Sequence, residues 1–173
     1  MADLILGSTT VMSESGGTAS LSSGLLNNTQ FPDGHVLQVV QQQHTSGASI
    51  STASTTPVAT GFIASLPSLK SNTNKIFISL NGGEADANGA GTRYLYFYQS
   101  INSASYTAIP NAEFGNYIGH TAYSRFPTAN QWLYSPGTTL QISIQVYMKV
   151  SANTIWFTNG RVTTLTLLSL IHI

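Results

Sequence analysis

Hydrophobic and polar residues alternate along most of the chain from Phe31 onward. Leu140–Val150 shows this most clearly, because all its even-numbered residues are apolar. Its odd-numbered residues are Gln, Ser and Gln, followed by Tyr147 and Lys149. A period of two is typical of a β-strand with one buried face. No stretch of the sequence shows the period of an amphipathic helix. The pattern therefore predicts an all-β fold.

The same reasoning predicts several further strands, separated by turns rich in Gly, Pro and Asn. Asn159-Gly160 favours a tight type I′ turn, so we expect the two segments that flank it to form a hairpin. Seven or so strands of this kind are typical of an antiparallel β-sandwich, and we expect one of the jelly-roll type. The further predicted strands are Val36–Gln43, Pro57–Leu66 (broken by Gly61), Lys75–Leu80, Thr92–Gln99, Asn153–Thr158 and Arg161–Ile171.

The stretch Ile101–Gly137 is harder to interpret, because three prolines are scattered among its aromatic residues. A structureless run of this length is unusual inside a compact domain. We expect one or two short strands and a functional loop here. Trp132 and Tyr134 are predicted to lie in the loop before Ser135, either as an exposed contact or as a plug for one end of the sandwich.

Residues 1–30 differ from the rest of the chain, being poor in aromatic residues and rich in Ser, Thr, Gly and Asn. Such a segment is either a disordered terminus or an extended arm that docks on a neighbouring subunit. We favour the arm, because it carries two apolar clusters that need to be covered. These clusters are Leu4, Ile5 and Leu6, and Leu25 and Leu26. The predicted organisation is thus an arm over residues 1–30 and a β-sandwich domain over residues 31–173.

Charge is the most unusual feature of the composition. Only 7% of the residues are charged, against about a quarter in an ordinary soluble domain. The 6 basic and 6 acidic residues cancel, and the basic residues are scattered, so we expect no nucleic-acid partner. Solubility as a free monomer depends largely on net and dispersed charge. A neutral surface therefore favours a protein that works inside an assembly.

The sequence also excludes several classes of chemistry and location. There is no cysteine, so disulfides and thiolate sites are impossible. No apolar run approaches the roughly twenty residues of a membrane span, so we expect no membrane partner. The first residues lack the basic region of a signal peptide, and folding in a cytoplasm is expected.

No motif points to catalysis, and we expect no catalytic residues, no cofactor and no metal. The histidines show no metal-ligand spacing. A general acid–base pair could still form from distant loops, for example Glu84 with Glu113. The segment Glu84–Gly89 mimics the first half of a calcium loop, but Leu95 stands where the closing glutamate belongs. We interpret it as a polar loop between two strands, with a looser cation site as the alternative.

Tyr94, Tyr96 and Tyr98 form an aromatic row on one face of a predicted strand. Three interpretations remain open. The tyrosines can pack into the core, because strands favour them and burial of the ring can leave the hydroxyl wet. They can form a subunit interface, where tyrosine is enriched. They can also form a stacking platform for a sugar.

Several segments of the chain resemble small structural proteins of tailed phages, especially phages of marine bacteria and cyanobacteria. The resemblance is spread over most of the chain and consists of strand and turn signatures. The segments are Met1–Thr18, Phe31–Val40, Thr60–Pro67, Ser71–Ile78 and Thr163–Leu168.

This resemblance implies a virion protein of the tail-fibre-like or head-decoration type, assembled in the host cytoplasm. Proteins of this kind are commonly trimers. The leading hypothesis is a non-enzymatic capsid decoration (cement) protein. It would be a homotrimer on the outside of the head, bound to the major capsid protein. The alternative is a short tail fibre or fibre tip that contacts host surface glycans. A polysaccharide-cleaving depolymerase ranks last, because paired acids are not evident.

Overall fold

The computed structural model describes residues 3–6, 9–15, 18–21, 35–45, 49–87, 89–118, 126–158 and 161–170. All regular elements in these ranges are β-strands, as the alternation predicted. No helix that could cross a membrane occurs among the described residues. The predicted boundary between residues 30 and 31 lies outside the described ranges.

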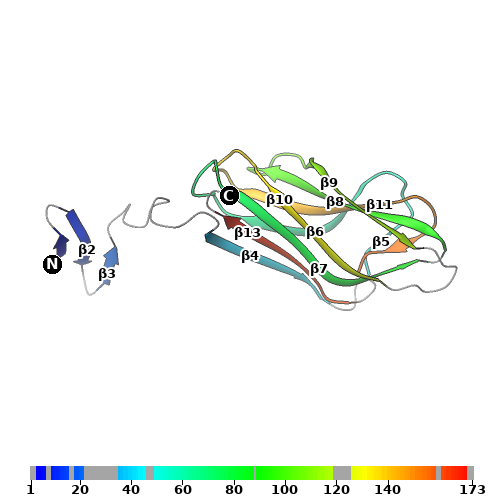
Figure 1. Cartoon of the computed structure of the whole chain (residues 1–173), viewed down its shortest axis with the longest axis horizontal. Coiled ribbons are helices and arrows are strands. Elements are labelled where there is room, and N and C mark those ends of the chain that lie inside the picture. Colours follow the sequence, from blue (N-terminus) through cyan, green and yellow to red (C-terminus); the bar gives the residue numbers. More distant parts are fainter. Residues whose placement is uncertain are drawn as a thin grey trace.

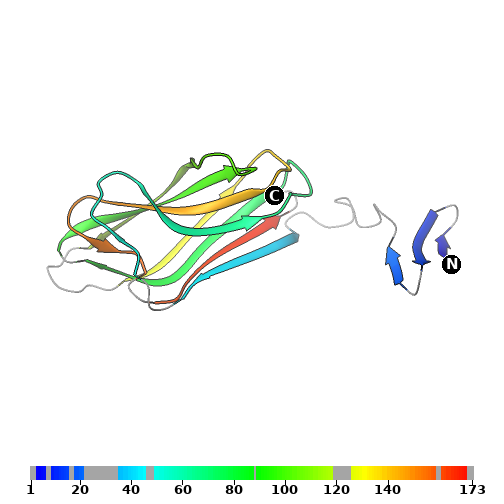
Figure 2. The same ribbon diagram turned by 180° about the vertical axis from the view of Figure 1, so that it is seen from behind.

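Eight long strands build the sandwich shown in Figures 1 and 2. A six-stranded sheet has the order β4-β13-β7-β12-β5, with β10 paired to β7, and a four-stranded sheet has the order β6-β11-β8-β9. All pairings are antiparallel. The long strands are β4 (Val36–His44), β6 (Val58–Leu66), β7 (Lys75–Ala87), β8 (Gly91–Ile101), β9 (Thr107–Ile118), β10 (Phe126–Tyr134), β11 (Ile142–Val150) and β13 (Thr163–Leu170).

The pairing of these strands is that of a jelly roll. The first long strand pairs with the last (β4 with β13), the second with the seventh (β6 with β11), the third with the sixth (β7 with β10) and the fourth with the fifth (β8 with β9). This is the pattern of one long hairpin rolled into two sheets, with β13–β7 and β11–β8 as the contacts that close the roll. The predicted all-β, jelly-roll sandwich is confirmed.

Shorter strands complete the structure. β5 (Ser51–Thr52) and β12 (Ile155–Trp156) pair with each other, and β12 joins the far end of β7. In the N-terminal segment, β1 (Asp3–Leu6), β2 (Thr9–Ser15) and β3 (Thr18–Leu21) form a three-stranded sheet of their own. These three strands are 4 to 7 residues long.

The core lies between the two sheets and is built from the inward half of each alternating strand. The inward residues of β11 are fully buried, as the sequence pattern predicted. Leu140 is an exception, because it precedes the strand and is 48% exposed. The central core side chains include Leu66, Ile76, Ile78, Leu80, Leu95, Phe97, Ile142, Ile144, Val146, Met148, Phe157, Leu165 and Leu167.

The predicted hairpin between Asn153–Thr158 and Arg161–Ile171 is wrong. β12 and β13 do not pair with each other, and both run antiparallel to β7. β7 bends at Gly82 and Gly83, where φ is positive, and the backbone nitrogen of Gly83 donates to the Val162 carbonyl at 2.8 Å. A Cβ at Gly82 would lie 2.5 Å from that same carbonyl oxygen, so the bend requires glycine. Asn159-Gly160 lies outside the described residues.

The stretch Ile101–Gly137 contains more regular structure than its prolines indicated. It forms two long strands, β9 and β10, instead of one or two short ones. Pro127 lies at a register shift at the start of β10, and Pro136 follows its end. Proline is tolerated at such positions because no ladder hydrogen bond is lost there.

A charged side chain, that of Arg93, lies between the two sheets. Arg93 points inward from β8 and is fully buried, and its Nη1 donates to Thr128 Oγ1 at 3.2 Å. Burial lowers its pKa to about 10. Charged groups are rarely buried in this way unless they are held by polar partners. Arg93 therefore joins β8 of one sheet to β10 of the other.

We expect Arg93→Ala to lower the free energy of unfolding by about 2–5 kcal/mol, because it leaves a cavity and a buried hydroxyl without its donor. Arg161→Ala is the control. Arg161 forms a surface ion pair with Glu84 at 3.4 Å, and its side chain is 61% exposed, so its loss should cost about 0–1 kcal/mol. Urea unfolding followed by far-UV circular dichroism measures both variants. Equal costs would contradict the structural role of Arg93.

Candidate binding faces of the sandwich

The outer face of the four-stranded sheet gathers the predicted tyrosine row and several residues from neighbouring strands. Tyr94, Tyr96 and Tyr98 lie on the outer side of β8, opposite Leu95 and Phe97 in the core. The register of β8 with β11 pairs Tyr96 with Tyr147 and Tyr94 with Lys149. We call this surface the tyrosine face, defined by Tyr94, Tyr96, Tyr98, Tyr147 and Lys149.

Side-chain contacts order the tyrosine face. The rings of Tyr98 and Tyr147 stack with centroids 3.8 Å apart and planes at 14°, and Tyr106 lies beside Tyr147 at 6.4 Å. The Lys149 ammonium lies 4.8 Å from the Tyr94 ring centroid and 5.3 Å from that of Tyr96. These are cation–π distances. Tyr96 is only 9% exposed, whereas Tyr94, Tyr98 and Tyr147 are half-buried. The face therefore offers partly covered rings together with hydroxyl groups and a cation.

The edge strand β9 supports this arrangement. Tyr94 is opposite Gly115, and a Cβ at Gly115 would be 3.4 Å from the Tyr94 ring. The ring thus lies close over the glycine backbone. Glu113 is opposite Tyr96 and is exposed. Glu113 supplies a carboxylate beside the ring and hydroxyl of Tyr96.

Burial and neighbouring groups shift the proton equilibria on this face. Burial raises the pKa of Tyr96 above its ordinary value of 10.0, and Glu113 adds to this while Lys149 opposes it. Burial, with the neighbouring phenols of Tyr98 and Tyr106, also raises the pKa of Tyr147. The adjacent Tyr96 hydroxyl raises the pKa of Lys149 above 10.5.

Trp132 and Tyr134 lie in β10, not in a loop as predicted. Both are half-buried and pack against the core. The Trp132 ring meets Phe114 edge-on at 6.3 Å, and the Tyr134 hydroxyl donates to Gln99 Oε1. Both side chains lie on the inner side of β10, because Leu133 between them is on the outer face.

The outer face of the six-stranded sheet has a different chemistry. Three rows of paired residues cross β4, β13, β7 and β10, and none of these residues is charged. The rows are Val39–Leu168–Phe77–Leu133, Gln41–Thr166–Ser79–Gln131 and Gln43–Thr164–Asn81–Ala129. We call this surface the neutral face. Val39 is 62% exposed and Leu133 is 42% exposed, at the two ends of the apolar row.

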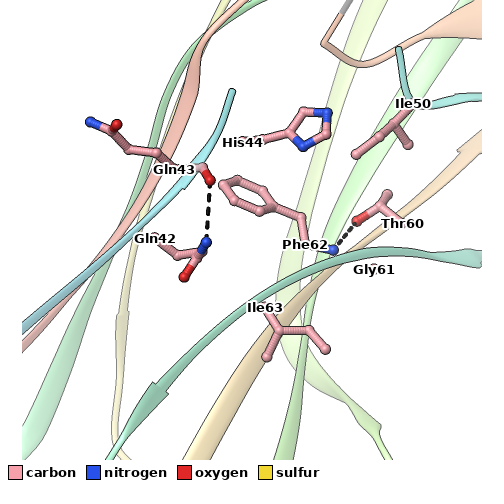
Figure 3. A pocket seen from close by; sticks show the side chains of 8 residues that line it. All are labelled: Gln42, Gln43, His44, Ile50, Thr60, Gly61, Phe62 and Ile63. Carbon is pink, nitrogen blue, oxygen red and sulfur yellow. Dashed lines mark hydrogen bonds between the residues drawn. The ribbon is translucent and has the colours of Figure 1, made fainter. Parts of the chain in front are cut away.

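A pocket of about 230 Å³ opens where β4 and β6 approach each other (Figure 3). The Phe62 and His44 rings lie 6.0 Å apart, and Gln42 and Ile63 flank them. Thr60 and Gly61 form a bulge in β6, where Thr60 Oγ1 donates to the Val146 carbonyl at 2.6 Å and accepts from the Phe62 nitrogen at 3.2 Å. The lining mixes amides and rings and contains no carboxylate.

The predicted loop Glu84–Gly89 is largely strand, because β7 continues to Ala87. Asp86 is 4% exposed, and Glu84 pairs with Arg161. Glu113 lies on the other sheet, so the structure does not support the acid pair of Glu84 and Glu113. Among the described residues, no group of three or more histidine and acidic residues could hold a metal ion. The predicted absence of catalytic and cofactor-binding residues remains a prediction.

The predicted arm contacts fall mostly outside what the structure describes. Leu4, Ile5 and Leu6 lie in β1, and Leu25 and Leu26 lie outside the described residues. Their role as subunit contacts stays a prediction.

Sequence reasoning missed that Tyr147 and Lys149 belong with the tyrosine row. Their odd positions in Leu140–Val150 already placed them on the outer side of that strand. What the sequence lacked was the pairing of β11 with β8. Tyr106 carries no comparable signal, because it precedes β9.

No family model matches this chain, and no curated protein matches its sequence. Among solved structures, the chain is similar to the enzymatically active domain of tailspike protein 4 of bacteriophage CBA120. The identity is 14%, the TM-score is 0.33, and the match covers 75% of this chain and 19% of that one. It is also similar to a chain of infectious bursal disease virus, Gx strain, at 9% identity and a TM-score of 0.36, over 98% of this chain and 48% of that one. The chain thus spans about a fifth and about half of these two chains. Both come from viruses, but TM-scores this low carry no conclusion about the function of this chain.

We expect the stability of the protein to fall as the pH rises above about 10. A phenol with a raised pKa in the folded state contributes stability below pH 10, which is lost at higher pH because the unfolded chain ionises first. Tyr96, Tyr134 and Tyr147 act in this direction, and so does Lys149. Arg93 acts in the opposite direction, since its lowered pKa relieves an unfavourable charge as the pH rises above about 10.

Urea unfolding at a series of pH values from 8 to 11.5 measures this dependence. Tyr147→Phe removes one of the ionising phenols and should make the fall shallower. An identical slope in the variant and the wild type would show that Tyr147 does not contribute.

Proposed function

We propose that this chain is a non-enzymatic structural protein of a tailed-phage virion, and that it decorates the outside of the capsid as a homotrimer. It would bind copies of itself and the major capsid protein. Such a protein acts by covering joints between shell subunits, so its mechanism is buried interface area. Stable contacts of this kind are large and apolar.

The observation that carries this proposal is the neutral face. The three rows of the neutral face carry no charged residue, and Lys75 lies beyond them at the start of β7. With Val39 and Leu133 exposed as well, these rows are poorly suited to bulk water. It is well suited to a neighbour of equally low charge, because no ionic group has to be desolvated. The jelly-roll topology supports the proposal, since this architecture recurs in viral capsid domains. Fold alone does not assign function, so the surface carries the argument.

A second function rests on the tyrosine face. Stacked, half-buried tyrosines with hydroxyl groups, an ammonium and a carboxylate offer ring surfaces and hydrogen bonds to a polar ligand. A host surface glycan fits this chemistry. The chain would then be a short tail fibre or fibre tip. Jelly rolls also occur in lectins.

Labelling the protein on purified virions and imaging them by electron microscopy tests the first proposal. We expect the label over the head. A chain that lacks residues 1–26 should keep its folded sandwich, checked by circular dichroism, but should no longer attach to particles, because the apolar clusters of the arm are gone. Label at the tail would overturn the decoration role, and normal attachment of the shortened chain would overturn the arm.

A glycan array with the intact protein separates the two functions. Decoration predicts no specific binding. If a glycan does bind, Tyr98→Ala and Tyr147→Ala should each weaken it at least tenfold, because each breaks the stacked pair. Gln131→Ala, on the opposite sheet, serves as the control and should bind normally. Binding that survives both tyrosine substitutions would exclude the tyrosine face as the site.

A further inference from the structure

The two sheets of the sandwich end in edge strands of different character. β6 and β9 are the edge strands of the four-stranded sheet. The six-stranded sheet has two long edge strands, β4 and β10, and a two-residue one, β5. An edge strand exposes unpaired backbone N–H and C=O groups, and proteins usually protect such edges with charges, prolines or bulges. The presence or absence of this protection therefore indicates which edges stay free.

Both edges of the four-stranded sheet are protected. β6 follows Pro57 and is interrupted by the bulge at Gly61, whose φ is +76°. β9 contains Pro110, the positive-φ residue Asn111 and the exposed Glu113, and its register with β8 shifts in this region. Neither strand offers a long regular edge for another strand to pair with.

The edges β4 and β10 lack this protection. The pairing of β4 with β13 is unbroken from Gln38 to His44, and that of β10 with β7 is unbroken from Thr128 to Tyr134. Neither stretch contains a proline, a lysine, an arginine or an acidic residue.

We propose that β4 of one copy of this chain pairs with β10 of the next copy, so that the six-stranded sheets join edge to edge in a closed ring. The directions fit. β4, β13, β7 and β10 are successively antiparallel, so β4 and β10 run in opposite directions and meet as an antiparallel pair when the copies are related by rotation about an axis along the strands. Strand addition at an edge supplies main-chain hydrogen bonds without any rearrangement of the sandwich.

The side chains favour a second copy as the occupant. Both edges are neutral, so their contact places no like charges opposite each other and buries no ionic group. The apolar row of the neutral face ends in exposed Val39 on β4 and exposed Leu133 on β10. Joining the edges brings these two ends toward each other and continues the row from copy to copy. A head-to-tail contact of this kind forms a ring when its rotation closes, and three copies match the proposed homotrimer.

The absence of cysteine makes the pairing directly testable. Single cysteines are placed at exposed outward positions of β4 (Val39, Gln41 or Gln43) in one chain and of β10 (Ala129, Gln131 or Leu133) in another. After mixing and mild oxidation, we expect disulfides between a β4 variant and a β10 variant, and none within either variant alone. A chain carrying Gln41→Cys and Gln131→Cys together should cross-link into trimers.

Matched controls and association measurements complete the test. Ile63→Cys on β6 and Glu113→Cys on β9 should not cross-link, because these edges are protected. Gln41→Lys should shift the protein from trimer to monomer in sedimentation analysis, since a lysine on an edge strand opposes the addition of another strand. Cross-links of a β4 variant with itself, or a monomeric wild-type chain, would overturn the proposal.

This inference deepens the self-association in the proposed function, and the two can fail separately. A monomer that still labels the phage head overturns the edge pairing and leaves the decoration role standing. A ring that forms through β4 and β10 but is absent from virions overturns the decoration role and leaves the edge pairing standing.

Discussion

Packing of the two sheets against each other is the interaction on which the rest of the molecule depends. Each long strand contributes every second side chain to a shared layer of aliphatic and aromatic residues, and the central ones are fully buried. Burial of this kind is the main favourable contribution to folding. The same packing places the remaining side chains of each strand on the outer face of its sheet. The chemistry of the outer faces is therefore set by the same alternation that builds the core.

The two outer faces differ in what they offer to a partner. One presents tyrosine rings, a lysine and a glutamate, and the three rows of the other present amides, hydroxyls and apolar side chains without charge. A charged and aromatic surface suits a polar ligand, whereas a neutral surface suits a protein neighbour. Only 7% of the residues in the chain are charged, so the position of each charged side chain strongly affects the surface or core around it. Arg93 is placed in the core, where it links the sheets through Thr128.

The prolines and glycines show how far local sequence signals can be trusted. The break at Gly61 was predicted, and the structure has a bulge there because glycine accepts a positive φ. The prolines of the stretch Ile101–Gly137 were interpreted as a loop, although Pro127 and Pro136 lie at the borders of a regular strand. Trp132 and Tyr134 were misplaced for this reason. Asn159-Gly160 suggested a hairpin, but the strands on either side of it, β12 and β13, both pair with β7 and not with each other.

The sequence by itself determined the all-β class, the position of most strands and the side of each strand that faces the core, because a period of two is a local property of neighbouring residues. It also placed Tyr94, Tyr96 and Tyr98 on a common face. Only the tertiary structure decided that Tyr147 and Lys149 join them, that Arg93 is enclosed between the sheets, and that β4 and β10 lie at edges of the six-stranded sheet. These features depend on which distant strands pair and in what register. Pairing is settled by the burial of the whole roll, which no single segment of the sequence encodes.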